Sequence, residues 1–204
     1  SKYMIDIFNS LEKEVDKGII GGNNGISLGL PGLDRYISIR KRIYTLIFGS
    51  SGTGKSSLAN CLYILNPFDW YWKNRHNTKI KLKIVYFSME RSSVYVTAKW
   101  LVRKIFLNEG VLIPLPKLMG WWDTKLTKDE HDLFLRYRPY FSNMEDIVEI
   151  IDGGTNPTGI YKWIKNYAAK NGRIEKISEF NQIYIPNDEN LITIILVDHQ
   201  SLIR

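Results

Sequence analysis

Residues 49–56 (GSSGTGKS) match the phosphate-binding loop pattern G-x-x-x-x-G-K-[ST] at every fixed position. The flanking sequence fits this pattern, because residues 42–48 (RIYTLIF) are typical of a buried strand and residues 56–65 (SSLANCLYIL) of a helix. A strand, a glycine loop and a helix in this order surround a bound phosphate with backbone N–H groups and a helix N-terminus. The motif therefore predicts an α/β fold that binds a nucleoside triphosphate.

Each part of the loop has an expected role. The glycines allow consecutive N–H groups to turn inward and form an anion nest. Lys55 is expected to reach the β- and γ-phosphates, and the Ser56 hydroxyl to be a ligand of Mg²⁺. The predicted nucleotide-binding residues are Gly49, Ser50, Ser51, Gly52, Thr53, Gly54, Lys55, Ser56 and Ser57.

A second pattern lies downstream of the loop. Residues 191–197 (LITIILV) are the most apolar run in the chain, and Asp198 follows them directly. An apolar strand that ends in an acid is the Walker B arrangement, whose carboxylate helps to hold Mg²⁺. The pattern is common by itself, but its position after a phosphate loop makes Ser56 and Asp198 the predicted metal ligands.

The remaining elements alternate between strands and helices, which is typical of a mainly parallel sheet flanked by helices. The other predicted strands are residues 83–88 and 147–151, and the other predicted helices are residues 92–106, 128–138 and 157–171. Pro67 and Pro139 are each expected to end the helix before them. Residues 173–190 form a polar insert, for which we expect a hairpin.

The chain opens with an amphipathic segment. Apolar residues recur at helical spacing within residues 3–17, and Gly21-Gly22 then interrupts the pattern. These apolar residues are Met4, Ile7, Phe8, Leu11 and Val15. We expect residues 1–20 to form a linker helix and residues 21–204 a separate core. The helix packs either on its own core or on a neighbouring subunit.

Composition excludes several classes of protein. No apolar run is long enough to span a bilayer, there is no signal-peptide pattern, and one cysteine cannot form an internal disulfide. The net charge of +7 is compatible with nucleic acid and equally with a lysine-rich solvated surface. Residues 68–72 are aromatic and residues 73–83 basic, a combination that suits base stacking, although we favour the simpler interpretation of an ordinary strand edge.

In their order, these motifs resemble the RecA-like ATPase domain of replicative DNA helicases of the DnaB-like group, which includes phage primase-helicases. The resemblance rests on three short segments in addition to the phosphate loop: Leu33-Asp34, Ser88-Met89-Glu90 and Asp198-His199. It implies that Glu90 is the catalytic base, acting with Lys55. It also implies ATP and Mg²⁺ as cofactors, single-stranded DNA and a homo-hexamer as partners, and the cytoplasm of a bacterium or of a phage-infected host as the location.

The chain departs from the family pattern in some respects. Gln200 follows His199 directly, and the insert at residues 173–190 is longer than the usual connection. In the family's sheet a further strand lies between the strands of the two Walker motifs. This strand, the DNA-binding loops and the arginine finger are expected beyond Arg204. We therefore expect a RecA-like sheet that is incomplete in this chain.

Two other functions remain open from the sequence. One is a recombinase or regulatory ATPase of the RecA or RadA type, and the other is a loader component that binds ATP as a switch. Glu90 is either the base or an ordinary carboxylate at a strand end. Arg91 either senses the γ-phosphate or is solvated.

Overall fold

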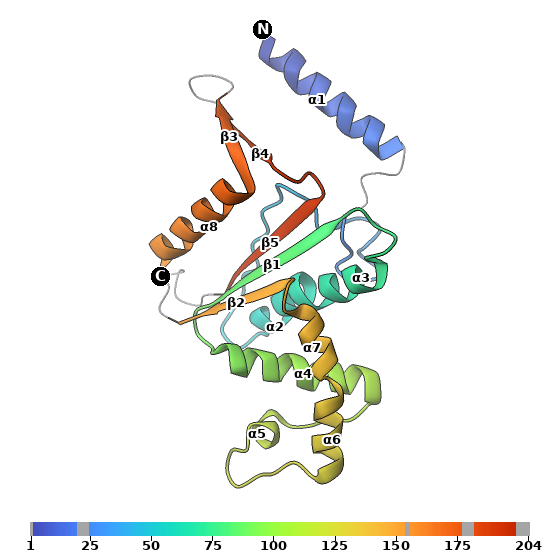
Figure 1. The fold of residues 1–204 in the computed structure, drawn as a ribbon, viewed down its shortest axis with the longest axis vertical. Coiled ribbons are helices and arrows are strands. Elements are labelled where there is room, and N and C mark those ends of the chain that lie inside the picture. Colours follow the sequence, from blue (N-terminus) through green and yellow to red (C-terminus); the bar gives the residue numbers. More distant parts are fainter. Residues whose placement is uncertain (1, 20–24, 154–155, 177–181, 199–204) are drawn as a thin grey trace.

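In the computed structural model, which describes residues 2–19, 25–153, 156–176 and 182–198, three parallel strands form the central sheet. The strands are β1 (Lys81–Ser88), β2 (Val148–Asp152) and β5 (Leu191–Asp198), in the order β2-β1-β5 (Figure 1). β1 lies in the centre and is covered on both faces, which explains why it reads as a nearly continuous apolar run. The predicted α/β class, with a parallel sheet flanked by helices, is confirmed.

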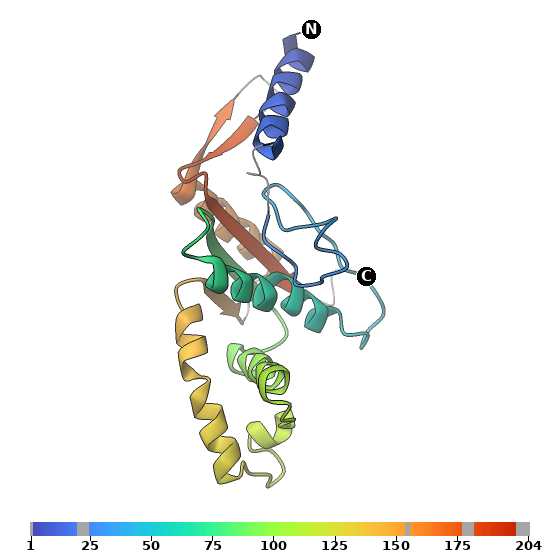
Figure 2. The same cartoon turned by 90° about the vertical axis from the view of Figure 1, so that its right-hand side faces the viewer.

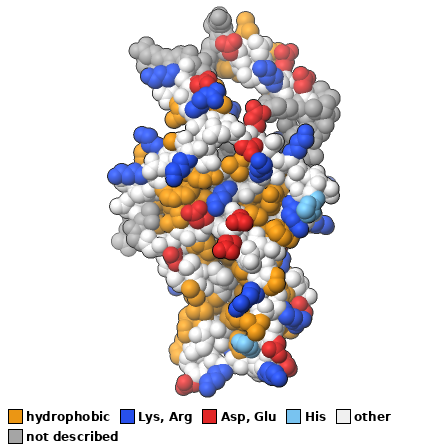
Figure 3. All heavy atoms as spheres, in the orientation of Figure 1, with side chains coloured by type: hydrophobic (Ala, Val, Ile, Leu, Met, Phe, Trp, Pro, Cys, Tyr) orange, Lys and Arg blue, Asp and Glu red, His pale blue; other side chains and the backbone are white. Residues whose placement is uncertain are grey.

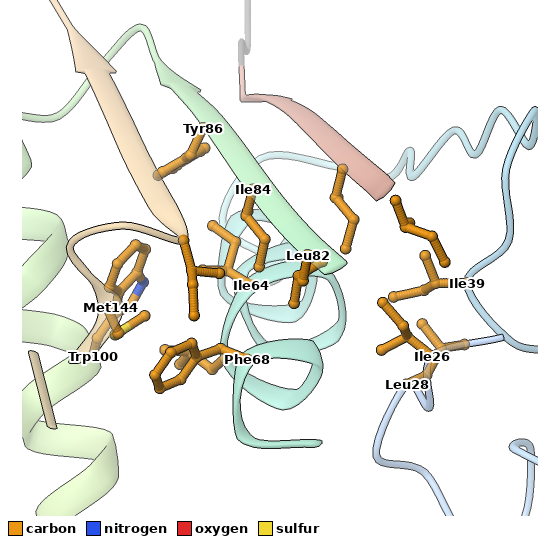
Figure 4. Close-up of a cluster of buried hydrophobic side chains, with 14 of the residues drawn as sticks. Ile26, Leu28, Ile39, Ile64, Phe68, Leu82, Ile84, Tyr86, Trp100 and Met144 are labelled. Atoms are coloured by element: carbon orange, nitrogen blue, oxygen red, sulfur yellow. The ribbon is translucent and has the colours of Figure 1, made fainter. Parts of the chain in front are cut away.

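One face of the sheet packs against the helical run that follows the phosphate loop. This run consists of α2 (Lys55–Asn60), the π-helical turn η1 (Cys61–Leu65) and α3 (Asn66–Asn74). Ile64 and Phe68 from the run meet Leu82 and Ile84 of β1 in the main hydrophobic core, where Trp100 also lies (Figure 4). Burial of these large side chains fixes the helical run, and with it the phosphate loop, against the sheet.

A group of helices separates β1 from β2 in the chain and extends below the sheet in Figures 1 and 2. Its members are α4 (Ser93–Glu109), α5 (Leu115–Leu118), α6 (Lys128–Arg136) and α7 (Arg138–Met144). The group has its own small core, which includes Leu101, Ile105 and Leu133. The Thr127–Glu130 capping box, evident from the sequence, forms at the start of α6.

The opposite face of the sheet is covered by α8 (Pro157–Asn171), whose Ile160 packs against Val85 and Phe87 of β1. After α8 the chain forms an antiparallel hairpin of β3 (Gly172–Lys176) and β4 (Gln182–Pro186). The hairpin predicted for the polar insert is thus confirmed.

The strand predicted for residues 42–48 is wrong. These residues are irregular and join neither sheet of the described structure, and Tyr44 and Phe48 are 87% and 76% exposed. A strand is stable only when its backbone N–H and C=O groups find partners on a neighbouring strand. Within the described ranges β5 pairs only with β1, and no ladder reaches residues 42–48. Apolar composition alone is therefore insufficient to form this strand.

Two predicted helix ends are also wrong, and proline explains both. Pro67 lies in the first turn of α3 rather than ending the previous helix, because the π-helical turn that precedes α3 changes the hydrogen-bond spacing. Pro139 lies in the first turn of α7, a position where its missing N–H costs nothing, while α6 ends at Arg136.

The N-terminal segment forms the predicted helix, α1 (Lys2–Ile19). Figures 1 and 2 show it at one end of the molecule, away from the sheet. Its apolar stripe is exposed, with Met4, Ile7, Phe8, Leu11 and Val15 between 44% and 62% accessible. The Gly21-Gly22 joint lies outside the described residues.

The aromatic residues after the phosphate loop belong to the core, whereas the sequence favoured an ordinary strand edge for this region; residues 81–83 begin β1, the central strand of the sheet. Phe68 is fully buried, and Trp70 and Trp72 pack against the same cluster. Acidic and basic side chains are intermixed on the face that Figure 3 shows, so the net positive charge is not concentrated there. In the part of the chain that the structure describes, no helix is long and apolar enough to cross a membrane.

Candidate nucleotide-binding site

The phosphate loop leads directly into α2 and adopts a conformation that depends on glycine. Gly52 and Gly54 have φ of 77° and 84°, in the left-handed region that other residues rarely adopt. Gly54 is the residue before the first helical position, and its carbonyl accepts the first helical hydrogen bond, from the N–H of Leu58 at 2.8 Å. The N-terminus of the helical run therefore faces the loop.

Lys55 lies over its own loop. Its Nζ donates to the carbonyl of Ser50 at 2.6 Å, and the Thr53 hydroxyl donates to the same carbonyl at 2.8 Å. The ammonium group is thus held beside the backbone N–H groups that the motif provides for phosphate. The role expected of Lys55 toward phosphate stays a prediction; a phosphate oxygen is a stronger acceptor for an ammonium group than the neutral carbonyl that it contacts here.

Asp198 comes to the same place from the far end of the described chain. It ends β5, where Ser88 and Asp152 end the two other strands in the same register. The Ser56 hydroxyl donates to Asp198 Oδ1 at 2.8 Å. The two residues predicted to share a metal ion, 142 positions apart in sequence, are therefore in direct contact at the carboxyl edge of the sheet.

The chemistry of this pair fits Mg²⁺. A serine hydroxyl and a carboxylate are hard oxygen ligands, and Mg²⁺ in nucleotide sites takes only one or two of them from protein and the rest from phosphate and water. No group of three or more His, Cys, Asp or Glu residues within the described ranges forms a metal site by itself. Ser56 and Asp198 are thus suited to an ion that arrives with a nucleotide.

Asp198 is also hydrogen-bonded to a buried polar network, which was not predicted from the sequence. The Tyr86 hydroxyl donates to Asp198 Oδ2 at 3.0 Å, and Asn60 Nδ2 lies 3.4 Å from the Tyr86 oxygen. Asn60 Nδ2 also donates to the Ser56 carbonyl at 2.6 Å, and its Oδ1 accepts from Trp100 Nε1 at 3.1 Å. Burial raises the pKa of Tyr86 to about 12, so the hydroxyl keeps its proton and remains a donor. One sequence signal existed: Asn60 is a polar residue one helical turn after Ser56 on an otherwise apolar face.

Glu90 lies two residues beyond the end of β1, on the same edge of the sheet as Asp198, and is exposed to solvent. The turn that carries it is fixed by the Ser88 hydroxyl, which donates to the Arg91 carbonyl at 2.7 Å. The guanidinium of Arg91 stacks on Tyr95, 5.0 Å from the ring centre. Glu90 thus occupies the expected edge, while Arg91 faces α4.

Two further charged residues, Lys99 and Asp152, have structural contacts. Lys99 Nζ on α4 lies 3.4 Å from the Ser57 hydroxyl. Asp152 accepts a hydrogen bond from the Ser93 N–H at the start of α4, and this bond lowers the pKa of Asp152 from its ordinary value. Asp152 therefore caps α4 and anchors the helical group to the sheet.

An apolar cavity lies away from the phosphate loop, among the helices between β1 and β2. It has a volume of about 650 Å³, lies between α4, α5, α6 and α7, and has only Arg138 and Glu145 as charged lining residues. An apolar cavity of this kind lacks the convergent donors that a triphosphate needs. The phosphate loop with Asp198 is therefore the candidate nucleotide site, and this cavity is not.

Comparison with known proteins gives no family assignment. The chain matches no protein-family model, and neither the curated proteins nor the solved structures include a significant match. The site is therefore argued from its own residues and geometry.

Proposed function

We propose that this chain is the motor domain of an ATP-dependent replicative DNA helicase, a RecA-like P-loop ATPase of the DnaB-like type. It couples ATP hydrolysis to translocation on single-stranded DNA and to duplex unwinding. The observation that carries the proposal is the 2.8 Å contact between Ser56 of the phosphate loop and Asp198 of β5. Two independent sequence patterns predicted these ligands, and their contact supports a single shared site.

Each predicted site residue has a separate chemical role. Lys55 and the N–H groups of the loop bind the β- and γ-phosphates and offset their negative charge. Ser56 and Asp198 hold Mg²⁺, which when bound neutralises charge that develops on the phosphate oxygens. Glu90 orients the attacking water and accepts its proton.

The proposed partners are single-stranded DNA and further copies of the chain in a homo-hexamer. The resemblance supplies both, and the net charge of +7 is compatible with DNA. The exposed apolar stripe of α1 supports assembly, because an isolated helix of this length is marginal in water and its apolar face favours burial. We propose that α1 docks on a neighbouring subunit, and that the protein works in the cytoplasm of a bacterium or of a phage-infected cell.

An unwinding assay on a forked DNA duplex, with ATP and the full-length protein, tests this function. We expect unwinding, and ATP hydrolysis that increases with single-stranded DNA, both lost in Lys55→Ala. Hydrolysis and strand exchange without unwinding would instead favour the recombinase. Tight ATP binding with little hydrolysis would favour the loader component.

A further inference from the structure

The buried network behind Asp198 joins four elements of the fold. Ser56 and Asn60 belong to α2, Tyr86 to β1, Trp100 to α4 and Asp198 to β5. Tyr86 is 1% exposed, and Asn60 and Trp100 are also buried. Buried polar groups are costly unless they are satisfied, and no buried side-chain nitrogen or oxygen of the described residues lacks a partner. A satisfied network of this kind is suited to hold one geometry.

The direction of each hydrogen bond follows from the chemistry of its donors. The indole N–H of Trp100 can only donate, so the atom of Asn60 that faces it must be the carbonyl Oδ1. This orientation turns the amide Nδ2 of Asn60 toward the Ser56 carbonyl and the Tyr86 oxygen. Because the Tyr86 oxygen then faces a donor, its own proton points to Asp198.

The two oxygens of Asp198 consequently have different roles. Oδ2 accepts from Tyr86, and this bond restricts rotation of the carboxylate about its Cβ–Cγ bond. Oδ1 is thereby held toward Ser56, the other predicted ligand. Asn60 contacts the other member of the pair, because its Nδ2 donates to the Ser56 carbonyl. Outer hydrogen bonds of this type orient metal ligands in many sites.

We propose that Tyr86, Asn60 and Trp100 are positioning residues that set the orientation of Asp198 and Ser56 toward nucleotide-bound Mg²⁺. This inference rests on the proposed nucleotide site but is independent of the helicase activity. It assigns a role in metal-dependent binding to three residues that touch neither nucleotide nor metal. The network affects the affinity for Mg²⁺, and the loop binds the phosphates without help from the network.

Tyr86→Phe removes only the hydroxyl, and the chain contains a matched control. Tyr140 is also a tyrosine whose hydroxyl donates to an aspartate, Asp69 Oδ1, at 3.0 Å in a partly buried hydrogen bond, and it lies in α7 among the helices outside the phosphate loop. Tyr140→Phe therefore removes the same kind of bond from a different part of the core. The probe is a fluorescent ATP analogue, titrated into each protein in EDTA and at increasing Mg²⁺ concentrations.

We expect Tyr86→Phe to bind the analogue in EDTA as the wild type does, but to need about 10-fold more Mg²⁺ for half of the metal-dependent increase in affinity. Tyr140→Phe should show the wild-type Mg²⁺ dependence. Equal Mg²⁺ dependence of Tyr86→Phe and the wild type would overturn the inference while leaving the nucleotide site intact. A wild type that does not bind the analogue at any Mg²⁺ concentration would refute the site itself.

Trp100→Phe provides a second test that leaves Tyr86 in place. It removes the indole N–H that fixes the Asn60 amide, and so permits the amide to reverse. We expect the Mg²⁺ requirement to rise in this variant too, by a smaller factor than in Tyr86→Phe. An unchanged Mg²⁺ requirement in a folded Trp100→Phe protein would remove Trp100 and Asn60 from the proposed role. If Tyr86→Phe fails to fold, an unchanged Mg²⁺ requirement in a folded Trp100→Phe protein would overturn the inference as a whole, because the Asn60 amide that orients the Tyr86 hydroxyl would then have no effect on the metal.

Discussion

Substitution of Lys55 by alanine separates the binding role of this residue from its role in the fold. Among the described residues the Lys55 Nζ donates to the Ser50 carbonyl in an exposed hydrogen bond, and Lys55 is the first residue of α2. Loss of one exposed hydrogen bond at a position where alanine is a good helix former should change the free energy of unfolding by at most about 0.5 kcal/mol. The melting temperature should therefore stay within about 2 °C of the wild type.

The effect on nucleotide binding should be much larger. A charge-assisted hydrogen bond from the Lys55 ammonium to phosphate is worth about 2–3 kcal/mol in a partly exposed site. This loss corresponds to an affinity for ATP that is roughly 30- to 150-fold weaker. Titration with a fluorescent ATP analogue measures the affinity, and thermal melting followed by circular dichroism measures the fold.

Lys99→Ala is the matched control for the loss of charge. Lys99 is an exposed lysine on α4 whose Nζ lies 3.4 Å from the Ser57 hydroxyl, close to the loop but outside the motif. We expect this variant to bind ATP within about 3-fold of the wild type, since exposed charges are strongly screened. Equal losses of affinity in the two variants would show that general positive charge, rather than the phosphate-loop geometry, binds the nucleotide.

Three further predictions address hydrolysis, assembly and pH. In the full-length assembled protein, Glu90→Gln should keep ATP binding but slow steady-state phosphate release by orders of magnitude, because the amide cannot accept a proton; equal release rates would make Glu90 an ordinary surface carboxylate. Phe8→Asp with Leu11→Asp should weaken oligomerisation in sedimentation experiments without lowering the melting temperature, since the two side chains are 60% and 56% exposed in α1; a double mutant that stays assembled, or one that unfolds, argues against docking on a neighbour. The pKa of Asp152 is lowered from its usual 3.8 because the carboxylate accepts a hydrogen bond from the Ser93 N–H. The stability that this bond contributes is therefore present above pH 3.8 and is lost on acidification, so the melting temperature of Asp152→Asn should depend less on pH between about pH 5 and pH 3 than that of the wild type. An equal pH dependence of the two melting temperatures would contradict this cause.

The elements that could be predicted from sequence are those with a strong local signal. The apolar runs at β1, β2 and β5 become strands, and the glycine loop and the helix after it form as expected. The contact between Ser56 and Asp198 was also predictable, because each residue belongs to a pattern with an expected role at the same metal ion.

The failures have physical causes that local sequence does not contain. Residues 42–48 have the composition of a strand, but strand formation depends on a neighbour with free backbone groups, and periodicity carries no information about that neighbour. Pro67 continues a helical run because a π-helical turn precedes it, a feature for which we know no sequence signal. Tyr86 looks like any apolar strand residue until the fold brings its hydroxyl to a carboxylate 112 positions away.

Metal-dependent binding of ATP by the wild type and by Asp198→Asn tests the shared site of Ser56 and Asp198 most directly. Asparagine keeps the shape of the side chain but removes the charge that attracts Mg²⁺. Calorimetric titration with ATP, in Mg²⁺ and then in EDTA, should show that Mg²⁺ strengthens binding by about 10-fold or more in the wild type and has almost no effect in Asp198→Asn. The two proteins should bind ATP equally in EDTA, where only the loop contributes. An Asp198→Asn protein that keeps the full Mg²⁺ effect would contradict the account, because the ion would then be held without the carboxylate that β5 brings to the phosphate loop.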